Sequence, residues 1–300
     1  MEERKIAIPI SGIDDSMIGA SINRWKIICI SANDDLDDTP DFAGIRGADC
    51  FGKLFDLLQW DGVYDSLSFI KKEPQFHIIA LAKTADISNY MFKWDYLTTV
   101  DAIRLFKTSQ VGFWIPIDFT EPKLKMLYDF LGLQSNPFEM ENPIFSLAED
   151  ENELFTTFVA RLCSLRYPSK VTQMIPFFHE ACKTKNKAVR FVLRITILEM
   201  LIDGNAELSY RLSHHLAVFL GRTLDESKQI ASNMKKMYNA RSKYLHEGDE
   251  SKITDEYCRL AYEYARRLIA NLTMTADSIQ EVRNKLDVAG YGTNPYQVQF

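Results

Sequence analysis

The sequence predicts an α+β domain at residues 1–148, followed by an all-helical bundle at residues 149–273 and a C-terminal tail at residues 274–300. In the first half, short runs of aliphatic and β-branched residues alternate with helix-like segments. From about residue 150 onward only helical periodicity remains, and glycines or helix-capping residues separate its segments. Short connections between successive helices favour an antiparallel bundle.

Four apolar runs in the first half are typical of short strands, and lie at residues 6–10, 25–30, 76–82 and 111–119. Pro9 and Pro116 suggest edge positions or strand ends, because proline has no N–H to donate to a sheet. Helical patterning is expected at residues 53–59, 96–107 and 120–132. A small mixed sheet with flanking helices is the resulting prediction for this domain.

The second half contains six segments with helical spacing of apolar residues, near residues 154–165, 171–182, 188–202, 208–219, 225–246 and 254–272. Gly221 is expected to end the fourth helix. Gly248 is expected to close the fifth in the left-handed conformation that a helix C-terminus often needs. Thr254 is expected to cap the sixth. The tail, which ends in the segment from Gly290 to Phe300, is expected to be irregular.

Composition favours a globular protein of the cytoplasm. With 46% hydrophobic and 25% charged residues, the chain can bury a sizeable core. No run approaches the ~20 apolar residues of a membrane span. The first residues lack the apolar segment of a secretory signal. We therefore expect a cytoplasmic protein with no membrane contact.

The sequence gives no support for a metal site. The five cysteines are scattered and show no C-x-x-C spacing. The acidic run at residues 33–41 lacks the glycine and the distal glutamate of a calcium loop. The adjacent His214 and His215 point to different sides of their helix, and His215, on the apolar face, is expected to be a core histidine. We expect no metal and no cofactor.

The net charge of −6 is unevenly distributed. Residues 1–148 carry 14 Lys and Arg against 22 Asp and Glu, whereas residues 149–273 carry 19 against 16. The positive excess in the second half is compatible with local RNA binding. Five basic residues cluster in the sequence around residues 183–194: Lys183, Lys185, Lys187, Arg190 and Arg194. This basic set either lines a path for RNA or belongs to a solvated loop and the start of a helix.

Two charged residues interrupt apolar helical faces in the second half. Arg241 lies between Met237 and Leu245 on one such face, and Glu199 lies on the face of an earlier helix. Because an unpaired charge on an inward face is costly, one expectation is a buried Glu199–Arg241 ion pair that fixes helix register. Arg211, on the flank of its own helix, either joins this pair or reaches solvent.

Arg241 and His246 also have the chemistry of a phosphodiesterase pair. Arginine binds phosphate through a bidentate fork and stabilises the charge that gathers on it. Histidine takes a proton from a ribose 2′-hydroxyl or gives one to the leaving 5′-oxygen. Such chemistry needs no metal and acts on RNA, because DNA lacks that hydroxyl. Candidate helpers beside the pair are Asn239, Ser242 and Lys243.

Helical geometry limits how Arg241 and His246 can meet. Positions five apart on a regular helix lie about 140° apart around the axis and about 7.5 Å apart along it. The pair therefore converges only if the helix end departs from regularity, or if two chains contribute one residue each. The second option predicts a homodimer with the motif at its twofold axis.

Three segments together resemble the HEPN domain family, and most closely its Apea-like branch. They are Ile197-Leu-Glu199-Met-Leu-Ile, the helix from Glu207 to Gly221, and Met237-Tyr-Asn-Ala-Arg241-Ser-Lys-Tyr-Leu-His246-Glu-Gly248. The family carries an arginine, four to six residues, and then a histidine, and Arg241 and His246 match with four residues between them. The residue after the arginine is often Asn, Asp or His, and here it is Ser242. The resemblance covers roughly residues 187–272.

The resemblance implies a metal-independent endoribonuclease in which Arg241 and His246 form a site completed across a homodimer. It also implies an all-helical bundle. Members of this family are common in bacterial toxin, antiviral-defence and RNA-processing settings. Some members lack activity and serve as interaction or RNA-binding modules, and in that alternative Arg241 is structurally paired to Glu199. The resemblance does not extend to residues 1–148, whose role stays unassigned.

Overall fold

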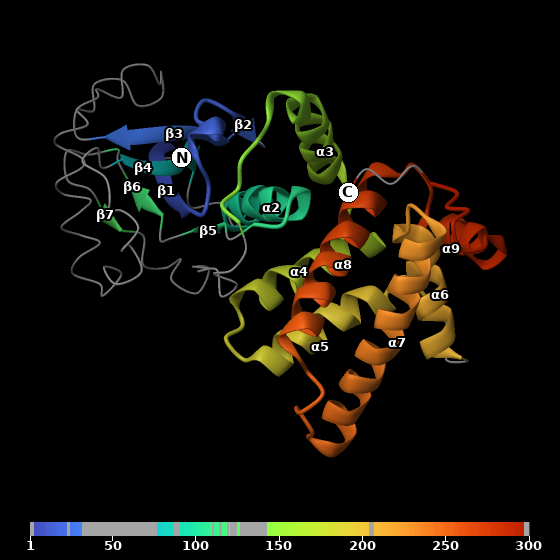
Figure 1. The fold of residues 1–300 in the computed structure, drawn as a ribbon. Coiled ribbons are helices and arrows are strands. Elements are labelled where there is room, and N and C mark those ends of the chain that lie inside the picture. Colours follow the sequence, from blue (N-terminus) through green and yellow to red (C-terminus); the bar gives the residue numbers. More distant parts are fainter. Residues whose placement is uncertain are drawn as a thin grey trace. The chain divides into compact units, whose positions relative to one another are not determined.

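The 300-residue chain is described by a computed structural model (Figure 1). The structure describes residues 3–22, 25–31, 77–86, 91–109, 111–113, 116–118, 120, 125–126, 143–203, 207–296 and 300. These residues belong to two compact units. The sheet unit lies within residues 1–100 and 109–159, and the helical unit within residues 101–108 and 160–300. A small sheet region followed by a helical region agrees with the predicted order of α+β and all-α parts.

The sheet unit is built on seven short strands: β1 (Glu3–Ser11), β2 (Ser21–Ile22), β3 (Trp25–Ser31), β4 (His77–Asp86), β5 (Gly112–Phe113), β6 (Ile117–Asp118) and β7 (Lys125–Met126). The strand order is β2-β3-β4-β1-β6-β7, and β5 pairs with the end of β1. Every strand pair in the described part of the sheet is antiparallel, so the expected mixed sheet is wrong. Ile6 and Ile8 of β1 and Trp25 and Ile27 of β3 are fully buried.

Two local expectations for this unit are also wrong. Pro9 lies inside β1, which has neighbours on both sides, and not at an edge or a strand end. On the side of β1 that faces away from β4, residues 6–7 pair with β6 and residues 10–11 pair with β5. Pro9 falls between these two pairings, so its lack of an N–H removes no hydrogen bond from either of them. In the helix expected at 120–132, Lys125–Met126 instead form β7, because pairing with β6 overrides the local helix signals. The helix expected at 53–59 and the acidic run at 33–41 lie outside the described residues.

The described residues include eight helices: α2 (Met91–Phe106), α3 (Asn152–Ser164), α4 (Lys170–Lys183), α5 (Lys187–Glu199), α6 (Leu208–Leu220), α7 (Leu224–Glu247), α8 (Asp255–Met274) and α9 (Ile279–Val288). Short 3-10 turns occupy Asp15–Met17 and Glu149–Glu151. The six predicted helices of the second half are confirmed as α3 to α8, although α5 ends three residues early. Where the structure describes the chain, no helix combines the length and the apolar character needed to cross a lipid bilayer.

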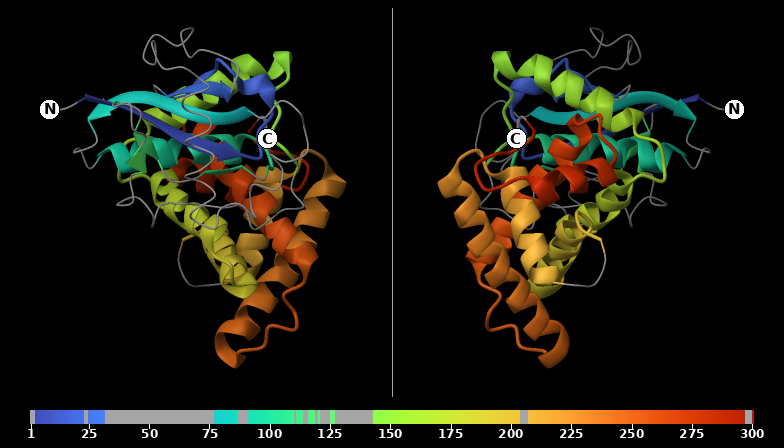
Figure 2. Two further views of the ribbon diagram at one scale, coloured as in Figure 1. Left: turned by 90° about the vertical axis from the view of Figure 1, so that its left-hand side faces the viewer. Right: turned by 90° about the vertical axis from the view of Figure 1, so that its right-hand side faces the viewer.

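Side-chain caps explain where several of these helices begin. Thr223 accepts a hydrogen bond from the N–H of Glu226, and Thr254 accepts one from the N–H of Tyr257. Gly221 ends α6, and its backbone N–H donates to the carbonyl of Ala217. Within the helical unit, α6 and α7 lie side by side and run in opposite directions, as the two rotated views also show (Figures 1 and 2). The short Gly221 connection produces this antiparallel pair.

A buried arginine of α8 binds the C-terminal end of α2, which itself belongs to the helical unit. Arg266 of α8 donates to the carbonyls of Leu105 and Phe106 at 2.9 and 2.8 Å, and these carbonyls are unsatisfied at a helix C-terminus. The carboxylate of Glu263 lies 2.7 Å from the same guanidinium and balances its charge. Asp101 of α2 contacts His179 of α4 at 3.1 Å. Nothing in the local sequence of α2 predicts these long-range partners.

The expectation of an irregular tail is wrong, because the tail contains helix α9 and packs within the helical unit. The capping box of Ser278 and Glu281 begins α9. Arg267 of α8 donates to the carbonyl of Phe300 at 3.0 Å, and Asn294 donates to the carbonyl of Phe219 at 2.8 Å. Residues near the end of the sequence therefore contribute to the same core as α6 and α8.

Candidate functional site

The Arg-x4-His motif lies on one continuous helix. α7 runs without interruption through Arg241 and His246 to Glu247. Gly248 then adopts a left-handed conformation with φ of 71°, and its N–H donates to the carbonyl of Tyr244 at 2.9 Å. The predicted glycine-closed helix end is confirmed. The last turns of α7 extend beyond the neighbouring end of α6 (Figures 1 and 2).

The guanidinium of Arg241 forms an ion pair with Glu199, the last residue of α5. Nη2 of Arg241 lies 3.0 Å from Oε2 of Glu199, and the two side chains are 22% and 23% exposed. The predicted pair is therefore present, but it reaches solvent and is not buried. Burial raises the pKa of the Glu199 carboxyl above its ordinary value, and the attraction of Arg241 only partly opposes this rise. Nε of Arg241 is buried and makes no hydrogen bond within the described residues.

A second arginine holds the end of α5 in place and so positions Glu199. Arg283 of α9 donates to the carbonyls of Leu201 at 2.8 Å, Ile202 at 2.9 Å and Met200 at 3.2 Å. These carbonyls follow directly after Glu199, where a helix end leaves acceptors without intrahelical partners. The buried guanidinium thus supports the backbone that carries the Glu199 carboxylate.

Arg211 takes a partner that neither alternative for it anticipated. Its Nη1 donates to the backbone carbonyl of Asp203 at 2.6 Å, and its Nη2 contacts the carboxylate of the same residue at 3.1 Å. Asp203 also lies 3.5 Å from Arg283. Arg211 therefore does not join the Glu199–Arg241 pair. Its side chain is 26% exposed and reaches solvent, as the second alternative predicted, while its contacts with Asp203 stabilise the connection between α5 and α6.

His246 does not meet Arg241 within one chain. Its side chain is exposed on the last turn of α7. Because the helix is regular there, the two residues stay about 140° apart around the axis. Leu245, expected on the inward face, is 49% exposed, so that part of the expectation is wrong. The apolar face loses its cover because these turns extend past α6.

The three candidate helpers stay on the surface of α7. Asn239 and Lys243 are exposed, and Ser242 is half-buried. All three lie within two residues of Arg241, but the helix directs them to different sides. The structure places them near the motif without joining them into one cluster.

The basic set at the start of α5 is held largely by local contacts. Lys187 lies 2.6 Å from the carboxylate of Asp255, Lys183 lies 3.7 Å from Glu180, and Arg190 donates to the carbonyls of Thr184 and Lys185 at 3.3 and 3.5 Å. Lys185 is exposed. Arg194 is buried, donates to the carbonyl of Cys258 and lies over the ring of Tyr262, so it cannot line a surface path. The set begins at the opposite end of α5 from Glu199, about 18 Å away along the helix axis.

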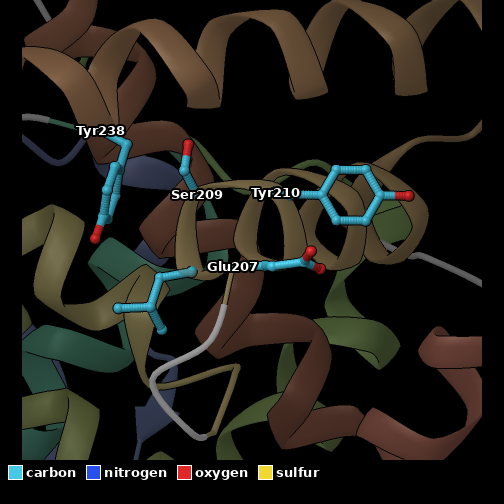
Figure 3. Close-up of a pocket in the computed structure, with 5 residues that line it drawn as sticks. Glu207, Ser209, Tyr210 and Tyr238 are labelled. Carbon is cyan, nitrogen blue, oxygen red and sulfur yellow. The ribbon is translucent and has the colours of Figure 1, made fainter.

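An open pocket of about 700 Å³ lies between the first turn of α6 and α7. Glu207, Leu208, Ser209, Tyr210 and Tyr238 line it. In Figure 3 the side chains of Tyr238 and Ser209 lie on one side, and those of Tyr210 and Glu207 extend to the other. These residues are not among those predicted from the sequence as a site. Tyr238 precedes Arg241 by three residues and therefore shares its face of α7, and this spacing could have indicated that Tyr238 lies beside the motif.

His215 of α6 is a buried histidine with one carboxylate partner. Its Nε2 lies 2.8 Å from the carboxylate of Asp287 on α9, and its side chain is 2% exposed. His214 beside it contacts the carbonyl of Ala289. The expectation of a core histidine is confirmed. In the part of the chain that the structure describes, no group of three or more His, Cys, Asp or Glu side chains is arranged to hold a metal ion.

The stability of the protein is expected to decrease when the pH is lowered below about 6.5, the ordinary pKa of histidine. Burial lowers the pKa of His215, the nearby charges of His214 and Arg211 act in the same direction, and Asp287 opposes them. The unfolded chain therefore binds a proton at a pH where the folded chain does not, which stabilises the unfolded state. Urea unfolding measured across this pH range should show a shallower decrease for His215→Gln than for the wild type. Equal slopes for the two proteins would contradict this prediction.

Comparison with known proteins gives no relative: no family model, no curated protein and no solved structure matches the chain.

Proposed function

We propose that the helical unit is a HEPN-type, metal-independent endoribonuclease. In this proposal Arg241 binds the scissile phosphate and His246 is the general acid/base, each supplied by a different chain of a homodimer. The observation that carries the proposal is that both side chains reach solvent at the end of one regular helix. A toxin or defence role of such an enzyme follows from the family resemblance.

The geometry of α7 supports a site shared by two chains. One regular helix separates the arginine and the histidine around its axis, so a second copy must bring the missing group. The extension of α7 beyond α6 leaves Leu245 exposed beside the motif, as a contact surface for that copy requires. In the reaction, Arg241 stabilises charge on the phosphate while His246 moves a proton to or from a ribose oxygen. The 2′-hydroxyl of RNA is the internal nucleophile, so no metal-bound water is required.

A second candidate function is a non-catalytic interaction or RNA-binding module. The 3.0 Å ion pair between Arg241 and Glu199 favours it, because a guanidinium already held by a carboxylate is less available to a phosphate. The two candidates differ in the role of Glu199. In the enzyme it competes with the phosphate for Arg241, whereas in the module it holds two helices in register.

Replacing Glu199 with glutamine is expected to increase the affinity for single-stranded RNA by about 2- to 5-fold, the strength of a partly exposed ion pair. The amide keeps the shape of the side chain but removes the charge that competes with phosphate. Binding can be measured by fluorescence anisotropy of labelled RNA, and cleavage by gel analysis in the presence of EDTA. Asp203→Asn is a matched control, because it removes one carboxylate charge from the Arg211 pair without touching Arg241.

The two candidates predict different results in this experiment. For the enzyme, the wild type cleaves RNA in EDTA, and Glu199→Gln binds RNA more tightly than either the wild type or Asp203→Asn. For the module, neither protein cleaves RNA, and Glu199→Gln lowers the free energy of unfolding because helix register is weakened. Absence of cleavage by wild-type protein at high concentration would remove the ribonuclease proposal.

A further inference from the structure

The pocket between α6 and α7 has the size and the chemistry of a small-ligand site. Its volume of about 700 Å³ lies within the range typical of ligand pockets. Its lining combines the aromatic ring of Tyr238 and the aliphatic side chain of Leu208 with hydroxyl and carboxylate groups. Apolar walls with a few polar groups are the usual composition of a site that binds an aromatic ring and orients it.

The polar groups of this pocket are available for a ligand. Within the described residues, the hydroxyl groups of Tyr238 and Ser209 make no hydrogen bond. Glu207, the residue before α6, has a left-handed backbone with φ of 51°, and its side chain does not cap the helix. The hydroxyls of Tyr238 and Ser209 lie on the same side of the pocket, whereas the Glu207 carboxylate extends to the other side (Figure 3). Each of these hydroxyls can donate or accept a hydrogen bond, as the edge of a nucleobase requires.

Tyr238 connects this pocket to Arg241. The two residues are three positions apart on α7, so their Cβ atoms are neighbours on the helix surface, about 5–6 Å apart. Arg241 contacts Glu199, the last residue of α5, which precedes the turn that leads into α6. A phosphate held by Arg241 therefore has an aromatic ring within reach of its own or the adjacent nucleotide.

The two tyrosines of the pocket have different surroundings. Tyr210 stacks on the ring of His214, with centroids 6.0 Å apart and planes 11° apart, and extends away from Tyr238 (Figure 3). One face of the Tyr210 ring is therefore already occupied. Tyr238 is half-buried and has no ring partner among the described residues, so its ring is the one that is not already stacked.

We propose that Tyr238 stacks on a base of single-stranded RNA in this pocket, with Ser209 contacting the edge of that base, next to the phosphate held by Arg241. The inference rests on the proposed function, because it names where the RNA substrate places a base. Stacking on a tyrosine tolerates any base, whereas a hydroxyl contact discriminates among base edges. Tyr238 is thus a substrate-binding residue, and base preference at this position arises from the residues that begin α6.

Tyr238→Ala is expected to weaken RNA binding by about 5- to 150-fold, the usual effect of removing one stacked aromatic side chain. Anisotropy of labelled single-stranded RNA of about 12 nucleotides is measured with the full chain in a His246→Ala background, so that cleavage does not interfere. Tyr238→Phe keeps the ring and should bind nearly as tightly as the parent. Tyr244→Ala is the matched control, because this tyrosine lies on the same helix but faces about 120° away.

A second measurement needs no change in the protein. RNA of the same length that lacks its bases should bind the parent protein as weakly as normal RNA binds Tyr238→Ala. The proposed base site would be wrong if Tyr238→Ala and the parent bound normal RNA with equal affinity. It would also be wrong if the parent bound RNA with and without bases equally well. Neither result alone contradicts the proposed ribonuclease function. If the wild type cleaves RNA in that case, the proposed function stands. A wild type that neither binds nor cleaves RNA would overturn both.

Discussion

Replacing His246 with alanine is expected to lower the rate of RNA cleavage by about 100- to 10,000-fold, the usual contribution of one general acid or base. The side chain is exposed on the last turn of α7 and is remote from the core, so the variant should fold as the wild type does. Cleavage of labelled single-stranded RNA is measured in EDTA, which inhibits contaminating metal-dependent nucleases by binding their metal ions. His214→Ala is the control, since it removes a histidine of α6 whose ring contacts the carbonyl of Ala289. Cleavage by His246→Ala at the wild-type rate would exclude the assigned role.

The same variant also tests whether two chains share the site. Arg241→Ala and His246→Ala should each be inactive, but their mixture should recover about a quarter of wild-type activity, since half of the dimers are mixed and each of these has one intact site of two. The recovery follows from the geometry of α7, in which a regular helix keeps the two side chains apart. A mixture that is no more active than the separate variants would place the complete site within one chain or remove the assignment.

Gly221→Ala is expected to lower the free energy of unfolding by about 3 kcal/mol, because the close approach of α6 and α7 leaves no room for a methyl group. A Cβ at this position would lie 2.6 Å from the carbonyl oxygen of Ala217 and 2.9 Å from Cα of Ser227, and closer still to the hydroxyl of Ser227. Two of these atoms belong to the backbone, so rotating a side chain cannot relieve the overlap. The effect can be measured as the urea dependence of helical circular dichroism.

A matched glycine makes the Gly221 experiment specific. At Gly290 the nearest atom to an added Cβ is Oγ1 of Thr293, at an ordinary 3.8 Å. Gly290→Ala should therefore change the free energy of unfolding by less than about 1 kcal/mol. Equal destabilisation by the two substitutions would mean that the contact between Gly221 and Ser227 does not determine the packing of α6 on α7.

Local signals predicted the limits of α7 and the position of Arg241 on its inward face. Thr223 begins the helix through its hydroxyl, and Gly248 ends it in a left-handed conformation, and both are short-range events that the neighbouring residues decide. Ile230, Met234 and Met237 are buried as their spacing predicts. The pairing of Arg241 with Glu199 also followed from the cost of leaving two inward charges unpaired.

Predictions from local sequence patterns were wrong where the contacts of a residue depend on an element that is distant in the sequence. Leu245 continues the apolar face of α7 but is exposed, because periodicity does not indicate how far the neighbouring helix extends. Arg194 is buried against Cys258 and Tyr262, although its sequence position suggests a surface residue, and the pairing of Arg211 with Asp203 was not predicted. At Lys125–Met126, strand pairing overrode local helix signals for the same reason.

By itself the sequence determined the order of a sheet region and a helical region, the glycine-marked ends of α6 and α7, and the angular separation of Arg241 and His246. These properties depend on the capping residues, on the spacing of apolar residues and on the fixed 3.6-residue turn of a helix. Only the tertiary structure decided that the Arg241–Glu199 pair reaches solvent, that Arg283 supports the end of α5, and that a pocket opens beside Tyr238. The exposure of a side chain and the shape of a pocket depend on where separate elements end against one another, and no local pattern contains that information.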